Sequence, residues 1–375
     1  MSSTSRPLAP LISFALQGLQ RCWMPELGRY SYRHRLDSQQ PPNESLPELD
    51  TFYTLNVLLG CSQIQTAKEL SIDIPAVYQS CCDEAGKLRW RTYTYGMALW
   101  AGAKLGFAPP AKLIDEVNNL LGNQRRLQTL TAQDVGMLAS GAVAMTIAEG
   151  GRWRALADLF ADRIRYLHHH KQTNLYFNSG AGLRRSFSSF ASQVYSILAL
   201  YHYGEAFDCD WALQMANRSV SRLIALQGRH GEWGWFYYAP GGRVVDFYEV
   251  YSVHQHGMAP AFLHHAVAHG VPGARDALIK GFRWLFGDNE MALPMLRPKE
   301  HMFYRSQVRQ GELRSTLPRM RRSIFNALSN RTDTAQRHHG LVLRRECRSY
   351  ELAWILWSFG AQTGYPELTS HPDFR

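Results

Sequence analysis

The densest group of residues able to move protons lies at positions 246–260, in the sequence DFYEVYSVHQHGMAP. If a helix begins near Glu249, residues three, four and seven positions apart share one face. That face would carry Tyr251, His254, Gln255 and Met258. Pro260 indicates that this region is a first turn or a kink, because a proline inside a helix removes a backbone hydrogen bond.

Histidine and tyrosine are the acid–base residues of this segment. His254 or His256 can act as a general base or acid near neutral pH, with Tyr248 or Tyr251 as the partner acid. The alternative is that these histidines only hydrogen-bond neighbouring loops. Taken as a whole, the cluster favours catalysis, and we take five residues as the catalytic candidates: Tyr251, His254, Glu249, Glu351 and His256.

Four carboxylates stand at or near the starts of apolar segments: Asp50, Asp134, Glu249 and Glu351. A carboxylate there ordinarily caps a helix or complements its dipole, and we expect that role for Asp50 and Asp134. Glu351 opens a wholly apolar segment, so its side chain should point into a central opening or towards a neighbouring cap. Two carboxylates facing across a ring are what glycoside hydrolysis needs, one as proton donor and one as base or nucleophile.

Candidate substrate-binding residues come from three other places. Residues 228–249, which we call the aromatic insertion, contain Trp233, Trp235, Tyr237 and Tyr248. Arg184 and Arg185 follow Asn178 ahead of an apolar segment, and an arginine pair can bind a carboxylate or sulfate bidentately. Gln255 and Arg348 complete the set of binding candidates.

Residues 296–348, which we call the basic insertion, contain most of the positive charge. They hold 13 Lys and Arg residues against four acidic residues, so they contribute nine of the ten excess positive charges. A basic lid over a cleft would raise the local concentration of an anionic ligand. A long solvated loop is the alternative interpretation.

These residues must be positioned by helices, and the sequence contains two alternating kinds of helical segment. One kind is amphipathic: residues 8–23, 66–82, 110–122, 153–170, 209–227 and 273–287. The other is apolar almost all round and closes on a glycine: residues 49–60, 92–106, 132–150, 188–204, 250–270 and 349–360. Those glycines stand where a helix C-cap favours a positive φ.

A helix without a polar face must be covered on all sides, so the apolar set belongs inside and the amphipathic set outside. The pattern predicts an all-α (α/α)6 toroid of six outer and six inner helices, in one domain spanning residues 1–375. The loops that lead from outer to inner helices then gather at one end, which we call the mouth. Short strand signals occur at 243–245 and 341–343.

With its helices counted, the chain resembles the (α/α)6-toroid superfamily, whose fold is described as six-hairpin glycosidase-like. The resemblance covers most of the chain and rests on architecture. It implies a carbohydrate-active enzyme, because glycoside hydrolases, polysaccharide lyases and uronyl epimerases use this fold, as do the related barrels of terpene cyclases. A local resemblance to the QW motif of triterpene cyclases involves Leu223, Gln227, Gly231 and Trp233. The acidic DxDD signature of those enzymes is missing.

The composition excludes several classes of protein. The 375 residues are 45% apolar and 19% charged, which is too apolar for a disordered chain, and no apolar run is long enough to span a membrane. The six cysteines form no CxxC pair, which is typical of a cytoplasmic protein. We expect no metal and no cofactor, since zinc, EF-hand and phosphate-loop spacings are absent. No recognisable nucleic-acid module is present.

Three functions remain open at this point. The first is a carbohydrate-active enzyme that acts on an acidic, uronic-acid-containing glycan by lyase, epimerase or hydrolase chemistry. The second is a terpene or prenyl cyclase-like enzyme, in which the aromatic residues would stabilise a carbocation. The third is a non-catalytic glycan-binding protein. The sequence does not predict an oligomeric state.

Overall fold

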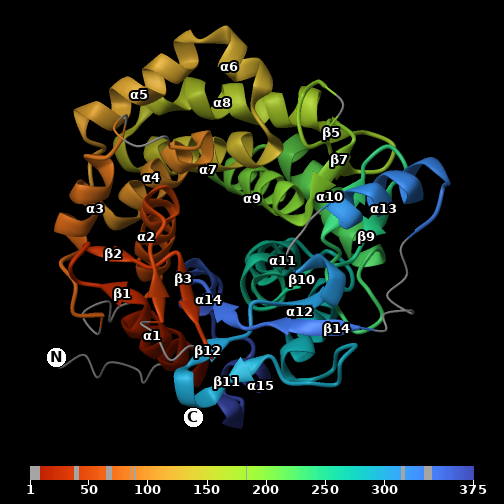
Figure 1. Cartoon of the computed structure of the whole chain (residues 1–375). Coiled ribbons are helices and arrows are strands. Elements are labelled where there is room, and N and C mark those ends of the chain that lie inside the picture. The colour runs from red at the N-terminus through yellow and green to blue at the C-terminus, as the bar shows by residue number, and fades with distance from the viewer. Residues whose placement is uncertain are drawn as a thin grey trace.

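Six mostly apolar helices form an inner ring in the computed structural model, which describes residues 9–37, 42–64, 70–85, 87, 90–182, 184–313, 317–332 and 340–375. They are α2 (Pro47–Cys61), α4 (Thr92–Leu105), α7 (Ala132–Glu149), α9 (Phe190–Phe207), α11 (Ala259–Ala268) and α14 (Ser349–Phe359). Each contacts the next along the chain, and α14 contacts α2, so the last inner helix meets the first (Figure 1).

Six outer helices cover this ring: α1 (Pro10–Cys22), α3 (Ile74–Cys82), α5 (Ala111–Gly122), α8 (Arg154–Arg163), α10 (Asp210–Ala225) and α12 (Ala274–Arg283). Each packs against an inner helix, as α8 does on α7 and α12 on α11. The predicted toroid of six outer and six inner helices is therefore confirmed. The residues expected at its centre, Val57, Leu99, Leu138, Leu198 and Ile355, are all fully buried.

The inner helices are held together by close backbone approach as well as by burial. Gly106 ends α4 with φ of 76°, as expected for a left-handed C-cap. Gly60 and Gly204 do not act in this way, since α2 and α9 continue past them. A Cβ at Gly60 would lie 2.7 Å from the Ala353 carbonyl oxygen, and one at Gly204 would lie 2.5 Å from Leu213 Cδ2. Gly60 therefore allows close approach of α2 to the backbone of α14, whereas Gly204 lies against the Leu213 side chain of the outer helix α10.

The short strands all lie in loops that lead from an outer to an inner helix, at the mouth of the toroid. The loops after α1 and α8 contain β1 (Trp23–Met24), β2 (Arg29–Tyr30), β3 (Arg33–Arg35), β4 (Asn43–Glu44), β5 (His169–His170), β6 (Leu175–Tyr176) and β7 (Phe187–Ser189). The aromatic insertion and the residues after it contain β8 (Phe236–Tyr238), β9 (Arg243–Asp246) and β10 (Val250–Tyr251). The basic insertion contains β11 (Leu296–Arg297), β12 (Met302–Phe303), β13 (Ser306–Arg309), β14 (Leu341–Arg344) and β15 (Glu346–Cys347). The strand signals at 243–245 and 341–343 correspond to β9 and β14.

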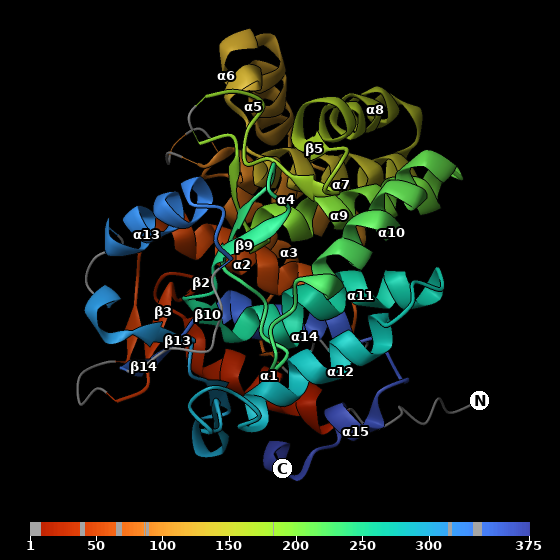
Figure 2. The same cartoon turned by 90° about the vertical axis from the view of Figure 1, so that its right-hand side faces the viewer.

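The two insertions meet at this mouth, as the sequence predicts. Strand β10 pairs with β13, which pairs with β14, and the short helix α13 (Leu317–Leu328) packs on β9. Figure 2 shows α13, β13 and β14 on the same side of the molecule as β3 and β10. Two further short helices, α6 (Gln124–Thr129) and α15 (Pro366–Thr369), lie outside the two rings.

Residues 252–268 are helical throughout, but the helix is irregular in its first half. After β10 the chain forms one π-helical turn, η4 (His254–Met258), and α11 then begins with Pro260 in its first turn. Pro260 directly follows this π-helical turn, and a proline inside a helix removes one backbone hydrogen bond, so the irregularity lies where the sequence predicts a kink. His254 and Met258 are consequently presented at the start of an inner helix.

Candidate active site

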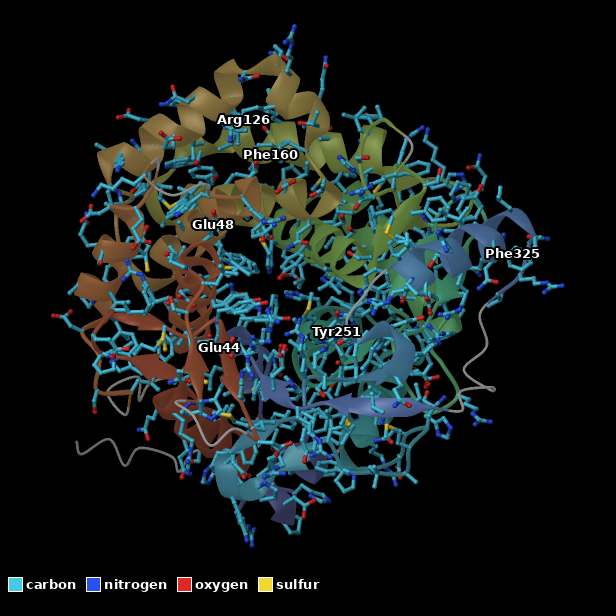
Figure 3. The ribbon with its side chains drawn as sticks, viewed as in Figure 1. Glu44, Glu48, Arg126, Phe160, Tyr251 and Phe325 are labelled. Atoms are coloured by element: carbon cyan, nitrogen blue, oxygen red, sulfur yellow. The ribbon has the colours of Figure 1, made fainter. Side chains whose placement is uncertain are left out.

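A cavity of about 250 Å³ lies at the mouth, where the inner helices begin. It is lined by Leu49, Phe52, Tyr53, Tyr93, Gln133, Ser189, Ala191, Tyr195, Trp235, Tyr251, His254, Met258, Arg305 and Tyr350. These residues come from the first turns of the inner helices and from both insertions. Figure 3 shows Tyr251 near the middle of the ring. The wall is thus rich in tyrosine, with one histidine and one arginine among its lining residues.

His254 is the basic group of this cavity. Its ring packs against Phe190 at 4.6 Å and against Tyr251 at 5.1 Å between centroids. Burial, reinforced by the charge of Arg305, lowers the pKa of His254 to about 3. The imidazole is therefore neutral at physiological pH. Its buried Nδ1 has no hydrogen-bond partner among the described residues, so no described side chain competes for that nitrogen of the unprotonated ring.

Tyr251 is the acidic partner. Its hydroxyl donates a hydrogen bond to Glu249 Oε2 at 3.2 Å. Burial and the neighbouring negative charge of Glu249 raise the pKa of Tyr251 to about 12, so the phenol keeps its proton at neutral pH. Tyr251 and His254 therefore form a protonated donor and an unprotonated acceptor on adjacent parts of one wall.

Glu249 is held ionised behind Tyr251. Arg344 Nε donates to Glu249 Oε1 at 2.7 Å, Arg319 Nη2 donates to Oε2 at 3.4 Å, and Ser306 donates a further short hydrogen bond. Burial alone would favour the protonated acid, but the hydrogen bond from Arg344 and the charge of Arg305 keep the pKa of Glu249 below its ordinary value. The carboxylate consequently acts on Tyr251 as a fixed negative charge.

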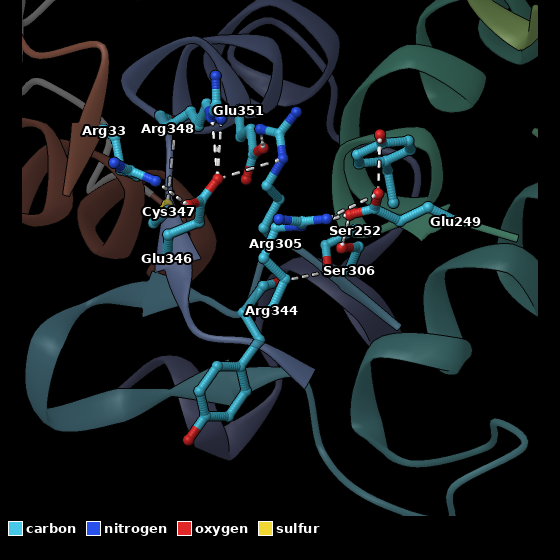
Figure 4. Close-up of polar contacts among 12 residues, drawn as sticks. Arg33, Glu249, Ser252, Arg305, Ser306, Arg344, Glu346, Cys347, Arg348 and Glu351 are labelled. Carbon is cyan, nitrogen blue, oxygen red and sulfur yellow. Dashed lines mark hydrogen bonds and ion pairs between the residues drawn. The ribbon is translucent and has the colours of Figure 1, made fainter. Parts of the chain in front are cut away.

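Arg305 carries positive charge to the cavity wall. Its Nη1 donates to Glu351 Oε1 at 2.7 Å, and its Nε lies 3.5 Å from Glu346 Oε1 (Figure 4). Its guanidinium carbon lies 4.9 Å from the ring centroid of Tyr251. The described residues provide no partner for its Nη2. Burial raises the pKa of Glu351 to about 7, although Arg305 and Arg348 act in the opposite direction.

The basic insertion is not a free basic lid, because buried carboxylates neutralise most of its inward-facing arginines. Five such pairs are Arg305–Glu351, Arg309–Asp246, Arg322–Glu312, Arg344–Glu249 and Arg348–Glu346. Several of the acids come from outside the insertion, so the charge of that segment alone does not reveal the pairing. Within the described part of the insertion, Arg305 is the residue that lines the cavity.

The predicted site residues fall into three groups. Tyr251, His254 and Trp235 line the cavity. Glu249, Glu351 and Arg348 lie directly behind it, the last donating from Nη1 to Tyr53 Oη at 3.2 Å. The remaining candidates do not line it: Trp233, Tyr237, Tyr248, Gln255 and His256 are buried within the wall, while Asn178, Arg184 and Arg185 lie in the loop before β7.

Several of the residues outside the cavity have evident structural contacts. Arg185 stacks on Phe177 with its guanidinium carbon 4.1 Å from the ring centroid. Gln255 Nε2 donates to the Tyr251 carbonyl at 3.3 Å. His256 packs on Phe303 at 4.6 Å, and neither of its ring nitrogens has a described partner. Asp134 forms a capping box with Thr131, as expected. Asp50 lies inside the first turn of α2, where it accepts from the Leu46 amide at 2.9 Å but is not the N-cap residue.

Sequence reasoning missed Arg305 and four cavity tyrosines: Tyr53, Tyr93, Tyr195 and Tyr350. The tyrosines carry a usable signal, since each lies within the first two turns of an apolar inner helix, where side chains face the mouth. Arg305 carries no such signal. Its position depends on the pairing of β13 with β10, which joins segments more than fifty residues apart.

A second cavity of about 420 Å³ lies at the opposite end of the toroid, among the C-terminal halves of the inner helices. Its lining includes Trp100, Ser140, His202, Glu205 and Trp357. The Ser140 hydroxyl and His202 Nδ1 are 3.0 Å apart, within hydrogen-bond distance. Neither insertion contributes to this cavity. The mouth cavity is the better candidate active site, because it alone of the two combines an acid, a base and an arginine supplied by the loops.

Two features are absent from the described part of the chain. No group of three or more His, Cys, Asp or Glu side chains there is arranged to hold a metal ion. No helix in that part is both long enough and apolar enough to cross a membrane. The six cysteines are all unbridged, and Cys22, Cys61, Cys81, Cys82 and Cys347 are buried.

Comparison with solved structures supports the (α/α)6 toroid as the fold of this chain. A sugar epimerase from a ruminal bacterium superposes with a TM-score of 0.63 at 10% identity, over 93% of this chain and 98% of the other. Cellobiose 2-epimerase from Bacillus thermoamylovorans gives 0.62 at 10% identity, with the same coverage of 93% and 98%. An unsaturated glucuronyl hydrolase from a Bacillus species gives 0.59 at 11% identity, over 92% and 94%. No family model matches the sequence, and no curated protein matches it.

Proposed function

We propose that this protein is a carbohydrate-active enzyme that removes a proton beside the carboxylate of a uronic-acid-containing glycan, as lyases and uronyl epimerases do. The observation that carries the proposal is the meeting of His254, Tyr251 and Arg305 at one aromatic cavity. Abstraction of such a proton needs a base, a proton donor and a cation to neutralise developing charge. Each of these three residues has the protonation state that its role requires.

His254 takes the proton on the carbon next to the carboxylate, and the pair of electrons from that bond delocalises onto the carboxylate, which Arg305 neutralises. In a lyase the electrons then form a carbon–carbon double bond while the neighbouring glycosidic C–O bond breaks, and Tyr251 protonates the departing oxygen. In an epimerase a proton returns to the same carbon from the other face, and Tyr251 is its donor.

Hydrolysis by two carboxylates is supported less well by this geometry. No Asp or Glu is among the lining residues of the cavity. Glu249 and Glu351, the nearest candidates, are buried behind Tyr251 and Arg305 and are bonded to arginines. A retaining or inverting hydrolase needs both carboxyl groups to flank the scissile bond directly.

The cyclase alternative is also less well supported. Gln227, the central residue of the QW-like motif, donates to the carbonyls of Gly231 and Ala277 at 2.8 and 2.9 Å and so braces α10 against α12. Trp233 is buried between Phe190 and Phe262 rather than exposed to a cavity. An arginine in the cavity wall suits a sugar acid better than a hydrocarbon cation. A cytoplasmic location remains part of the proposal, supported by the six unbridged cysteines.

The test is a product analysis on two matched substrate sets. Uronic-acid oligosaccharides and the same oligosaccharides with their carboxyl groups reduced to alcohols are incubated with the protein, and the products are analysed by mass spectrometry and NMR. The proposal expects an unsaturated or epimerised sugar from the acidic set only. Hydrolysis products, turnover of the carboxyl-reduced oligosaccharides, or binding without any product would contradict the proposal.

A further inference from the structure

Helix α13 buries its polar face and exposes its apolar face, which is the reverse of an ordinary surface helix. An ordinary surface helix buries its apolar stripe and exposes its polar face. In α13 the buried side chains include Arg319, Ser323 and Asn326. The exposed side chains include four large apolar residues: Met320, Ile324, Phe325 and Leu328, the last two being 56% and 84% exposed. Figure 3 shows Phe325 at the outer rim of the molecule.

This orientation is fixed by specific contacts of the polar face. Arg319 Nη2 donates to Glu249 Oε2 at 3.4 Å, and its guanidinium carbon lies 4.8 Å from the Trp235 ring centroid. Asn326 Nδ2 donates to the Val245 carbonyl at 2.9 Å. Arg243 Nη2 donates to the Ala327 carbonyl at 2.7 Å, near the C-terminal end of the helix. The apolar stripe therefore faces outward because the polar side is bound to β9 and to the site.

The arginines on the two sides of α13 also differ in whether a carboxylate neutralises them. Arg319 and Arg322, on the protein side, pair with Glu249 and Glu312. Arg321 and Arg331, on the outer side, have no acidic partner among the described residues, and the Arg331 guanidinium carbon lies 5.6 Å from the Phe325 ring centroid. The outer face thus combines bulky apolar side chains with unneutralised positive charge.

We propose that α13 is a membrane-surface anchor, which inserts its apolar stripe among lipid chains while Arg321 and Arg331 contact anionic headgroups. A helix with a basic polar edge and large apolar residues lies in the interface of a bilayer in this way. Nucleic-acid phosphates would use the arginines but not the stripe. A second copy of the chain at this face would bring like charges together, on a chain whose net charge is already +10.

Docking through α13 places the mouth of the toroid beside the membrane. The helix packs on β9, and its Arg319 contacts both Trp235 of the cavity wall and Glu249 behind it. The anchor is independent of the reaction proposed above, since it requires only the surface of α13.

The test is co-flotation of the full chain with vesicles. Wild-type protein should float with vesicles of phosphatidylcholine mixed with phosphatidylglycerol, and binding should fall on adding salt. Vesicles of phosphatidylcholine alone should bind it much more weakly. The variant R321Q/R331Q should bind the anionic vesicles about 30-fold more weakly, as loss of two surface cations predicts. R125E on α6 exchanges one exposed arginine and is the charge control.

A second pair of variants tests the apolar stripe. F325E should abolish flotation, whereas I147E, at a residue on α7 that is 65% exposed, should float as wild type does. Melting temperatures of both variants should stay within a few degrees of the wild type, since neither side chain is buried. The proposal is overturned if wild-type protein does not float with anionic vesicles, or if F325E floats unchanged. It is also overturned if size-exclusion chromatography shows that F325E converts a dimer into a monomer.

Discussion

The Tyr251 hydroxyl donates a hydrogen bond to Glu249 Oε2, 3.2 Å away, at the point where β10 enters the cavity. The phenol faces the cavity, while the carboxylate is buried behind it and bound by Arg344. An ionised acid in that position keeps the phenol protonated and fixes the direction of its hydroxyl. Glu249 is thus a positioning residue for Tyr251, and the arginines of the basic insertion position Glu249.

The first prediction concerns that buried charge. Glu249→Gln should destabilise the fold by about 3 kcal/mol, because Arg344 and Arg319 lose a shared buried counter-ion. Chemical denaturation measures the loss. Glu44→Gln removes a carboxylate that pairs with Arg33 and Arg35 nearer the surface, and it should cost less than about 1 kcal/mol. Equal losses of unfolding free energy in the two variants would show that the buried carboxylate of Glu249 stabilises the fold no more than the carboxylate of Glu44 does.

The second prediction separates two tryptophans of the aromatic insertion. Trp235→Ala should lower glycan affinity about tenfold and cost only about 1 kcal/mol of stability, since Trp235 lines the cavity. Trp233→Ala should cost about 3–5 kcal/mol, because Trp233 is fully buried against Phe190 and Phe262. Calorimetric titration and denaturation of both variants check this. A larger stability loss in the Trp235 variant would contradict the assignment.

These two tryptophans also show what a sequence can predict here. The composition of residues 228–249 marks the whole insertion as aromatic. The full burial of Trp233 and the partial exposure of Trp235 depend on how β8, the strand that follows them, pairs with β7 and β9. The ring of helices was predictable because apolar faces and glycines repeat along the chain. Arg305 was not, since strand pairing between β10 and β13 positions it. The sequence also could not predict that carboxylates neutralise the arginines of the basic insertion. Three of those carboxylates, Asp246, Glu249 and Glu351, lie outside the insertion in sequence.

The third prediction concerns Arg305. Arg305→Lys keeps a positive charge beside Glu351 but loses the planar guanidinium, so the fold should survive. Affinity for an acidic oligosaccharide should fall by roughly 10- to 100-fold, the value of one charged hydrogen bond. Affinity for the carboxyl-reduced oligosaccharide should change by less than about threefold. If the variant weakens both ligands equally, Arg305 does not recognise the acid group.

The fourth prediction is a pH dependence of stability. Burial lowers the pKa of His256 to about 3, from an ordinary value of 6.5. The unfolded chain therefore binds a proton below pH 6.5 that the folded protein refuses, and stability falls as the pH drops from 6.5 towards 3. In His256→Leu this contribution disappears. The plot of unfolding free energy against pH should be shallower in the variant by up to about 1.4 kcal/mol per pH unit. Parallel slopes would mean that His256 is protonated in the folded state.

The last prediction addresses the proposed reaction through exchange with solvent. Both a lyase and an epimerase of this kind break the bond between carbon and hydrogen beside the carboxylate. In heavy water, the carbon next to the carboxylate should therefore gain deuterium in the epimerised product, or lose its proton in the unsaturated product. A hydrolase leaves that proton in place.

The most direct measurement is NMR of a uronic-acid oligosaccharide incubated in heavy water with wild-type protein, His254→Asn and Tyr251→Phe. Loss of the proton signal beside the carboxylate is expected with the wild type. We expect it to be slowed by at least about a hundredfold in both variants, whose melting temperatures should stay within a few degrees of the wild type. Retention of that proton through wild-type turnover, or unchanged exchange in the folded His254→Asn protein, would contradict the assignment of His254 as the base.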